Sequence, residues 1–173
     1  MFTIYHADCI GQAGNCLYPH AVEITDKASL AQAVNKDYVC AEYKGSYRNN
    51  DNFIGSNCLP VDCDNDHSED PEDWKYPSDI ADAFPGVAVA VHYSHNHMKV
   101  KNGKPARPKF HVFFAIDPVT DAEQYASLKK AGEHYLPVLR HQGTGCRQIL
   151  LRHQESAGGD LQWSYDPDHL PCR

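Results

Sequence analysis

Short apolar segments alternate along this chain with polar stretches rich in glycine, proline and asparagine. The pattern predicts strands at residues 1–5, 37–43, 58–64, 87–93 and 110–116. It predicts helices at residues 28–34, 79–84 and 120–135, the first capped by Thr25 or Asp26 and the last by a capping box of Thr120 and Glu123. We expect segment 1–5 at a sheet edge, segment 87–93 as a buried strand, and segments 6–20 and 44–57 as loops.

Strands outnumber helices, and the two kinds are mixed along the chain. We therefore expect the α+β class, with a central, mostly antiparallel sheet and flanking helices. No apolar run approaches the roughly 20 residues that span a bilayer, and the N-terminus lacks the basic and apolar regions of a signal peptide. The expectation is a cytoplasmic protein with no membrane partner. Its seven cysteines include no CxxC pair and are expected to be reduced thiols, although a zinc site built on Cys9 and Cys16 stays open.

An acidic motif ends the third predicted strand, where Asp62 and Asp64 follow the apolar lead-in 59–61. Residues two apart on a strand point to the same face, so the two carboxylates are expected side by side. Such a pair is stabilised by a hard divalent cation, which favours a Mg²⁺ or Mn²⁺ site. Two alternatives are a solvated acidic turn and a calcium loop over 62–73, which lacks the glycine and glutamate of an EF-hand.

A basic stretch precedes the strand at 110–116, although the net charge of the chain is -7. Its cations are Lys99, Lys101, Lys104, Arg107 and Lys109. His111 follows on the strand itself, and a cationic patch beside a histidine is typical of a triphosphate site. The alternatives are a solvated lysine hairpin with a half-buried histidine, and a metal cluster of His92, His95 and His97.

The two motifs in this order resemble the archaeo-eukaryotic primase superfamily. The similar segments are Leu59-Pro-Val-Asp62-Cys-Asp64 and Arg107-Pro-Lys109-Phe-His111, joined by a connector from His92. The stretch from Tyr5 to about Leu136 looks like the primase-polymerase domains of bacterial mobile elements and phages. The resemblance implies a primase-polymerase (RRM-like) catalytic core at 1–136, incomplete at its C-terminus.

The resemblance also implies a function, which is metal-dependent, template-directed addition of nucleotides. Asp62, Asp64 and His111 would be catalytic, with Mg²⁺ or Mn²⁺ on the two aspartates. Arg107, Lys109 and His111 would contact the nucleoside triphosphate. Lys99, Lys101, Lys104 and Tyr93 would bind the DNA template, and a helicase domain or protein is a further expected partner.

The tail at 137–173 departs from this pattern. It lacks the third acidic motif of the superfamily and repeats Leu-Arg-His-Gln at 139–142 and 151–154. Permissible codons from Val138 onward, read one base later, encode a string that begins Tyr-Phe-Asp-Thr-Lys and looks like the third-motif region. We hypothesise that the tail is a frameshift product and the chain weakly active or inactive; the alternative is a natural short variant. The coding DNA decides, because codons at 138–154 that cannot yield that string contradict the hypothesis.

Two other function classes stay open on the residues alone. One is a non-catalytic DNA-binding accessory of replication, which needs the lysines but not Asp62 and Asp64. The other is a relaxase-type endonuclease, which needs two alternating histidines on one strand. Val112 and Phe113 follow His111, which disfavours the endonuclease.

Overall fold

The computed structural model describes residues 1–100, 103–138, 154–155 and 161–162, and the chain divides into two compact units. The first unit comprises residues 1–60 and 114–129, and the second comprises, of the described residues, 61–100, 103–113 and those from 130 onward. The class is α+β with antiparallel sheets, as the pattern predicts. Most of the tail at 137–173, and with it the frameshift hypothesis, lies outside the described residues.

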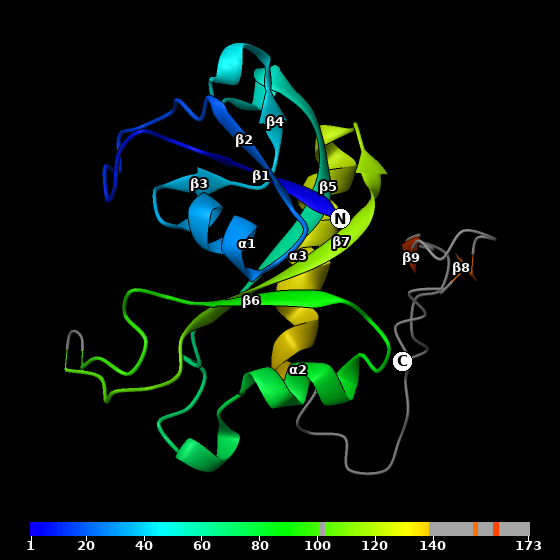
Figure 1. Ribbon diagram of the computed structural model, residues 1–173. Helices are drawn as coiled ribbons and strands as arrows, with labels where there is room; N and C mark the ends of the chain where they lie inside the picture. Colours follow the sequence, from blue (N-terminus) through cyan, green and yellow to red (C-terminus); the bar gives the residue numbers. More distant parts are fainter. Residues whose placement is uncertain (101–102, 139–153, 156–160, 163–173) are drawn as a thin grey trace. The chain divides into compact units, whose positions relative to one another are not determined.

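The first unit begins with a three-stranded antiparallel sheet and one helix (Figure 1). Its elements are β1 (Phe2–His6), β2 (His20–Ile24), α1 (Lys27–Val34) and β3 (Tyr38–Val39). The strand order is β2-β1-β3, so the prediction of an edge strand at 1–5 is wrong. The segment is central because His20–Ile24 forms a strand that the pattern did not predict. The predicted cap of α1 is confirmed, since the Asp26 carboxylate accepts a hydrogen bond from the Ser29 amide at 2.8 Å.

The rest of the first unit contains β4 (Glu42–Tyr43), two 3-10 turns (Lys44–Ser46 and Asn50–Asn52), and parts of β5 (Phe53–Cys63), β7 (Phe110–Val119) and α3 (Ala122–Val138). β5 begins well before the predicted strand at 58–64, in a stretch whose Gly and Asn residues favoured a loop. Gly55 explains the discrepancy: a Cβ there would lie 3.1 Å from the Val119 carbonyl oxygen, so glycine permits a close backbone approach.

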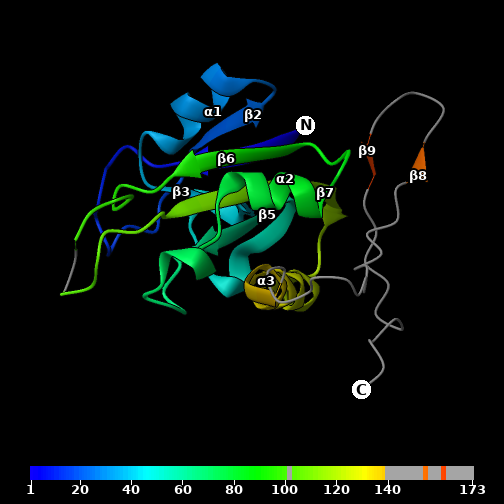
Figure 2. The same cartoon turned by 90° about the horizontal axis from the view of Figure 1, so that it is seen from below.

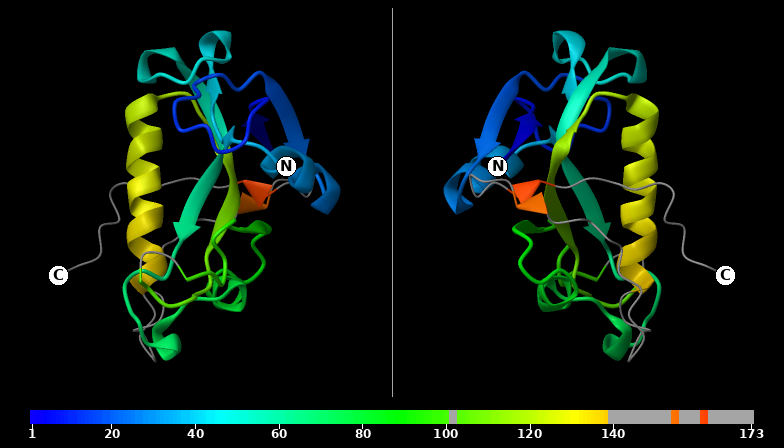
Figure 3. Two further views of the ribbon diagram at one scale, coloured as in Figure 1. Left: turned by 90° about the vertical axis from the view of Figure 1, so that its left-hand side faces the viewer. Right: turned by 90° about the vertical axis from the view of Figure 1, so that its right-hand side faces the viewer.

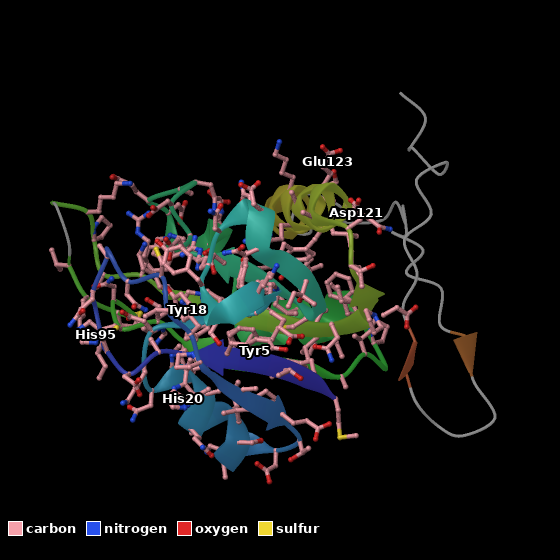
Figure 4. The ribbon with its side chains drawn as sticks, turned by 90° about the horizontal axis from the view of Figure 1, so that it is seen from above. Tyr5, Tyr18, His20, His95, Asp121 and Glu123 are labelled. Carbon is pink, nitrogen blue, oxygen red and sulfur yellow. The ribbon has the colours of Figure 1, made fainter. Side chains whose placement is uncertain are left out.

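The start of α3 packs beside β5 and the end of β7 in this unit (Figure 3). Tyr125 is buried with Ala41 and Val119, and its hydroxyl donates to the Cys58 carbonyl at 2.9 Å. Asp121 and Glu123 lie at the N-terminal end of the helix (Figure 4). The Asp121 carboxylate accepts from the Gln124 amide at 2.7 Å, in place of the predicted cap by Thr120.

The second unit contains the end of β5, a 3-10 turn (Pro71–Asp73), α2 (Pro77–Ala83), β6 (Val89–Tyr93) and the first part of β7. The four-stranded sheet has the order β4-β5-β7-β6, and β5 and β7 each contribute residues to both units. Trp74, Ile80, Phe110 and Val112 are buried in the second unit. The prediction of a buried strand at 87–93 is wrong, because the residues of β6 are half-buried or exposed.

β6 and β7 lie side by side, and a long connection between them extends away from the sheet (Figure 2). This connection carries most of the predicted basic stretch. Residues 154–155 and 161–162 form a separate two-stranded ribbon, β8 (Gln154–Glu155) with β9 (Leu161–Gln162). No helix among the described residues is long and apolar enough to cross a membrane.

Candidate nucleotide and metal site

The acidic motif lies at the end of β5, within the second unit. Val61, Cys63 and Asn65 are buried, whereas the intervening Asp62 and Asp64 are exposed. This alternation confirms that the two carboxylates share one face of the strand. Burial raises the pKa of the Cys63 thiol to about 11, so the cysteine between them stays neutral at physiological pH.

The basic motif runs into β7 with the same periodicity. Arg107, Lys109 and His111 alternate with Pro108 and Phe110, which are buried. Lys109 and His111 therefore lie on one face of the segment, whereas Arg107 is itself buried. The sequence spacing K-x-H produces this directly, since residues two apart on an extended chain point the same way.

The two faces meet in a set of cross-strand ion pairs. Asp62 Oδ1 lies 2.5 Å from His111 Nδ1, and Asp64 Oδ1 lies 3.3 Å from Lys109 Nζ. Asp66, two residues further on, pairs with Lys109 at 3.4 Å. Asp62 faces His111 and Asp64 faces Lys109, so a step of two residues forward in the acidic motif matches a step of two backward in the basic motif, as expected for antiparallel neighbours. The structure therefore brings together the residues that the sequence analysis assigned to the metal and the nucleotide.

Asp66 is the most heavily paired acid of the motif. Its Oδ1 lies 3.4 Å from both Lys109 Nζ and Arg107 Nη1, and 3.8 Å from Lys104 Nζ. Partial desolvation raises the pKa of this carboxyl, but the combined charges of Lys109, Lys104 and Arg107 outweigh it, so the pKa lies below its usual value. Asp66 is not among the residues predicted to hold the metal, although its place two residues after Asp64 gave the signal.

Two buried polar side chains hold the motifs in place. Arg107 is 2% exposed, and its Nη1 donates to the Asn65 carbonyl at 2.8 Å and to the Ser68 carbonyl at 3.3 Å. The Asn65 amide group donates to the carbonyls of Lys75 and Pro108 and accepts from the Lys75 amide. These bonds tie the chain after β5 to the segment before β7. Arg107 therefore has a structural role that the sequence analysis did not foresee.

His92 lies next to His111. Their rings are stacked with centroids 6.2 Å apart and planes inclined by 17°. His97 instead accepts a hydrogen bond from the Lys109 amide at 3.3 Å. Its ring packs against Tyr93, with ring centroids 4.3 Å apart. His95 is exposed on the connection after β6 (Figure 4). No group of three His, Cys, Asp or Glu residues able to hold a metal is found among the described residues, so the histidine-cluster and calcium-loop alternatives gain no support there.

The residues assigned to the DNA template are less closely grouped. Tyr93 contacts Phe110, with ring centroids 6.4 Å apart. Phe110 faces away from His111, so Tyr93 lies on the opposite face of the sheet from the acidic motif. Lys99 is exposed, Lys104 belongs to the cluster around Asp66, and Lys101 lies outside the described residues.

The donor chemistry at the acidic motif fits a hard divalent ion. Asp62 and Asp64 supply two carboxylates on one exposed face. Mg²⁺ commonly takes one or two carboxylates and completes its coordination with water and substrate phosphates. The described residues thus fit the ion that the resemblance implies, with the nucleotide supplying further oxygens. The open zinc alternative gains no support, because Cys9 Sγ lies 3.7 Å from an Asp37 carboxylate oxygen and Cys16 Sγ lies 3.9 Å from the Gly14 carbonyl oxygen.

No protein-family model, curated protein or solved structure matches this chain.

The His92–His111 pair predicts a pH dependence of stability. Burial, and after it the neighbouring His111, lower the pKa of His92 below its ordinary value of 6.5. The folded state then binds fewer protons at this site than the unfolded state, so the stability contributed by His92 is present above pH 6.5 and is lost as the pH falls through the folded pKa. In urea unfolding at about pH 7.5 and 5.5, the wild type should lose more stability than His92→Gln.

The matched control is His95→Gln, which removes an exposed imidazole from the same region. It should lose as much stability on acidification as the wild type. Equal losses for His92→Gln and the wild type would contradict the prediction.

Proposed function

We propose that the second unit carries the nucleotide site of a primase-polymerase, a nucleotidyltransferase that adds nucleotides on a DNA template with a divalent metal ion. One observation carries the proposal. Asp62 and Asp64, adjacent on one face, contact His111 on β7 and Lys109 just before that strand, at 2.5 and 3.3 Å. Acidic and basic groups in one place supply ligands for the ion and donors for a triphosphate.

The roles of the side chains follow from their chemistry. Lys109 is a mobile point charge, so it can turn from Asp64 and Asp66 toward a phosphate oxygen. The His111 ring contacts Asp62 through Nδ1, and an imidazole N–H can donate to a phosphate oxygen. Asp62 therefore orients the ring as well as presenting an oxygen to the ion. A bound Mg²⁺ or Mn²⁺ supplies activation of the attacking hydroxyl and stabilisation of the leaving pyrophosphate.

The test is nucleotide addition with Mn²⁺. Dinucleotide synthesis and primer extension should be measured for the chain as it stands and for a restored chain, in which the residues from Val138 are encoded in the shifted frame. We expect addition by the restored chain and weak or no addition by the present one. The proposal fails if the restored chain is inactive and Asp62→Ala changes neither ion binding nor nucleotide binding.

A second candidate is a non-catalytic DNA-binding module of replication. It is favoured by the ion pairs themselves, because Asp62, Asp64 and Asp66 each already face a basic side chain. This function predicts salt-dependent DNA binding that survives loss of Asp62 and Asp64. The binding would be lost when Lys99, Lys101 and Lys104 are replaced together.

A further inference from the structure

The cluster around Asp66 joins three cations at one carboxylate oxygen. Arg107, Lys109 and Lys104 all lie within 3.8 Å of Asp66 Oδ1. Arg107 is almost fully buried, the Lys109 side chain is 14% exposed, and the Lys104 side chain is 54% exposed. Three converging donors around one oxygen are the arrangement with which proteins bind phosphate.

The cluster holds more positive than negative charge. Lys109 also pairs with Asp64, so among the described residues the three cations pair with two carboxylates, those of Asp64 and Asp66. Arg107 Nη2 is buried and has no hydrogen-bond partner among the described residues. A buried guanidinium nitrogen without an acceptor is costly, and a polyanion has the oxygens to satisfy it.

The position of Arg107 does not depend on Asp66. The Arg107 guanidinium is fixed by the carbonyls of Asn65, Ser68 and Pro105. Asn65 in turn is anchored to Lys75 and Pro108. Replacing the Asp66 carboxylate therefore leaves the buried cation in place.

We propose that Lys104, Arg107 and Lys109 form a polyphosphate site in which Asp66 occupies the position of a phosphate oxygen while the chain is free. A polyphosphate must displace this carboxylate, so Asp66 weakens binding and keeps the cations paired until the ligand arrives. The inference rests on the proposed function for its ligand, the triphosphate of a nucleotide. It adds Lys104 to the phosphate contacts and gives Asp66 the role of an internal competitor.

The experiment measures binding of inorganic tripolyphosphate to the full chain by calorimetry, at low ionic strength and without divalent ions. Asp66→Asn removes one negative charge beside the ligand, and we expect about threefold to tenfold tighter binding. Glu69→Gln is the control: it removes the same charge three residues away, and among the described residues Glu69 forms no ion pair. It should change the affinity by less than about twofold. Lys104→Gln should weaken binding.

Several outcomes overturn the inference. These are weaker or unchanged binding by Asp66→Asn, an equal gain in Glu69→Gln, no tripolyphosphate binding by any variant, and a response to a single-stranded oligonucleotide but not to tripolyphosphate. Asp66→Ser provides a second variant in case the first does not fold. Unfolding of both would show that Asp66 is structural and would also overturn it.

The result is distinguishable from failure of the proposed function. Tripolyphosphate binding needs no metal and no catalysis. Tighter binding by Asp66→Asn together with no nucleotide addition by the restored chain would refute the enzyme and leave the polyphosphate site. Nucleotide addition by the restored chain, with no effect of Asp66→Asn on tripolyphosphate binding, would refute the polyphosphate site and leave the enzyme.

Discussion

Asp62→Asn is expected to lower the rate of nucleotide addition by the restored chain about 1000-fold, which corresponds to ~4 kcal/mol of transition-state stabilisation. The substitution keeps the size of the side chain and an oxygen that faces His111, but it removes the charge that the ion requires. Asp62 is exposed at the end of β5, so the fold should not be affected. The rate of primer extension at saturating Mn²⁺ is the measurement.

Asp82→Asn is the matched control, because it removes an exposed carboxylate from α2 in the same unit. It should leave the rate within about twofold of the unsubstituted chain, as is usual for surface changes away from a site. Mn²⁺ binding to the present chain gives a second measurement, and Asp62→Asn should weaken it. A rate that falls less than about tenfold in Asp62→Asn would show that this carboxylate is no metal ligand.

Asn65→Ala is expected to destabilise the second unit by about 3 kcal/mol. Asn65 is 3% exposed, and its side chain makes hydrogen bonds of 2.7 to 3.0 Å with Lys75 and Pro108. Alanine leaves those buried backbone groups without their partner, which costs about 1 kcal/mol or more each. Its backbone φ is 53°, a left-handed conformation that asparagine tolerates better than alanine does. Urea unfolding at constant pH measures the loss.

Asn65→Gly separates the two causes. Glycine relieves the left-handed backbone and loses the same hydrogen bonds, so it should be about 1 kcal/mol more stable than Asn65→Ala. Asn50→Ala, at an exposed position, should change the free energy of unfolding by less than about 0.5 kcal/mol. Equal stabilities of Asn65→Ala and the wild type would contradict the structural role of Asn65.

The sequence predicted helices and strands correctly where residues close in the chain were enough to define them. The helix at 28–34 and its Asp26 cap are confirmed, because a capping side chain acts within one turn. The strands at 58–64 and 110–116 were found through their apolar residues, but both are longer than predicted. Their extra residues include Gly55 and Pro118, whose types favour loops and whose strand conformation depends on neighbouring strands.

In the candidate site too, some features follow from residue spacing and others depend on the tertiary structure. Alternation along each strand is enough to place Asp62 with Asp64, and Lys109 with His111, from residue spacing alone. The sequence did not indicate the position of Tyr93 on the other face, the stacking of His92 on His111, or the buried bonds of Arg107. Each of these depends on which strands are neighbours and in what register, and a spacing of two residues on a single strand contains no such information.

The sequence by itself determined the α+β class and the composition of two polar faces, one acidic and one basic, because side-chain alternation is a property of each strand alone. Only the tertiary structure decided that these faces oppose each other and that Asp66 lies among three cations. Residues 62–66 and 107–111 are far apart in the chain, and the register in which the neighbouring strands β5 and β7 lie brings them together. The buried side chains of Asn65 and Arg107 then hold that register through hydrogen bonds to backbone carbonyls, the groups that a sequence pattern does not distinguish.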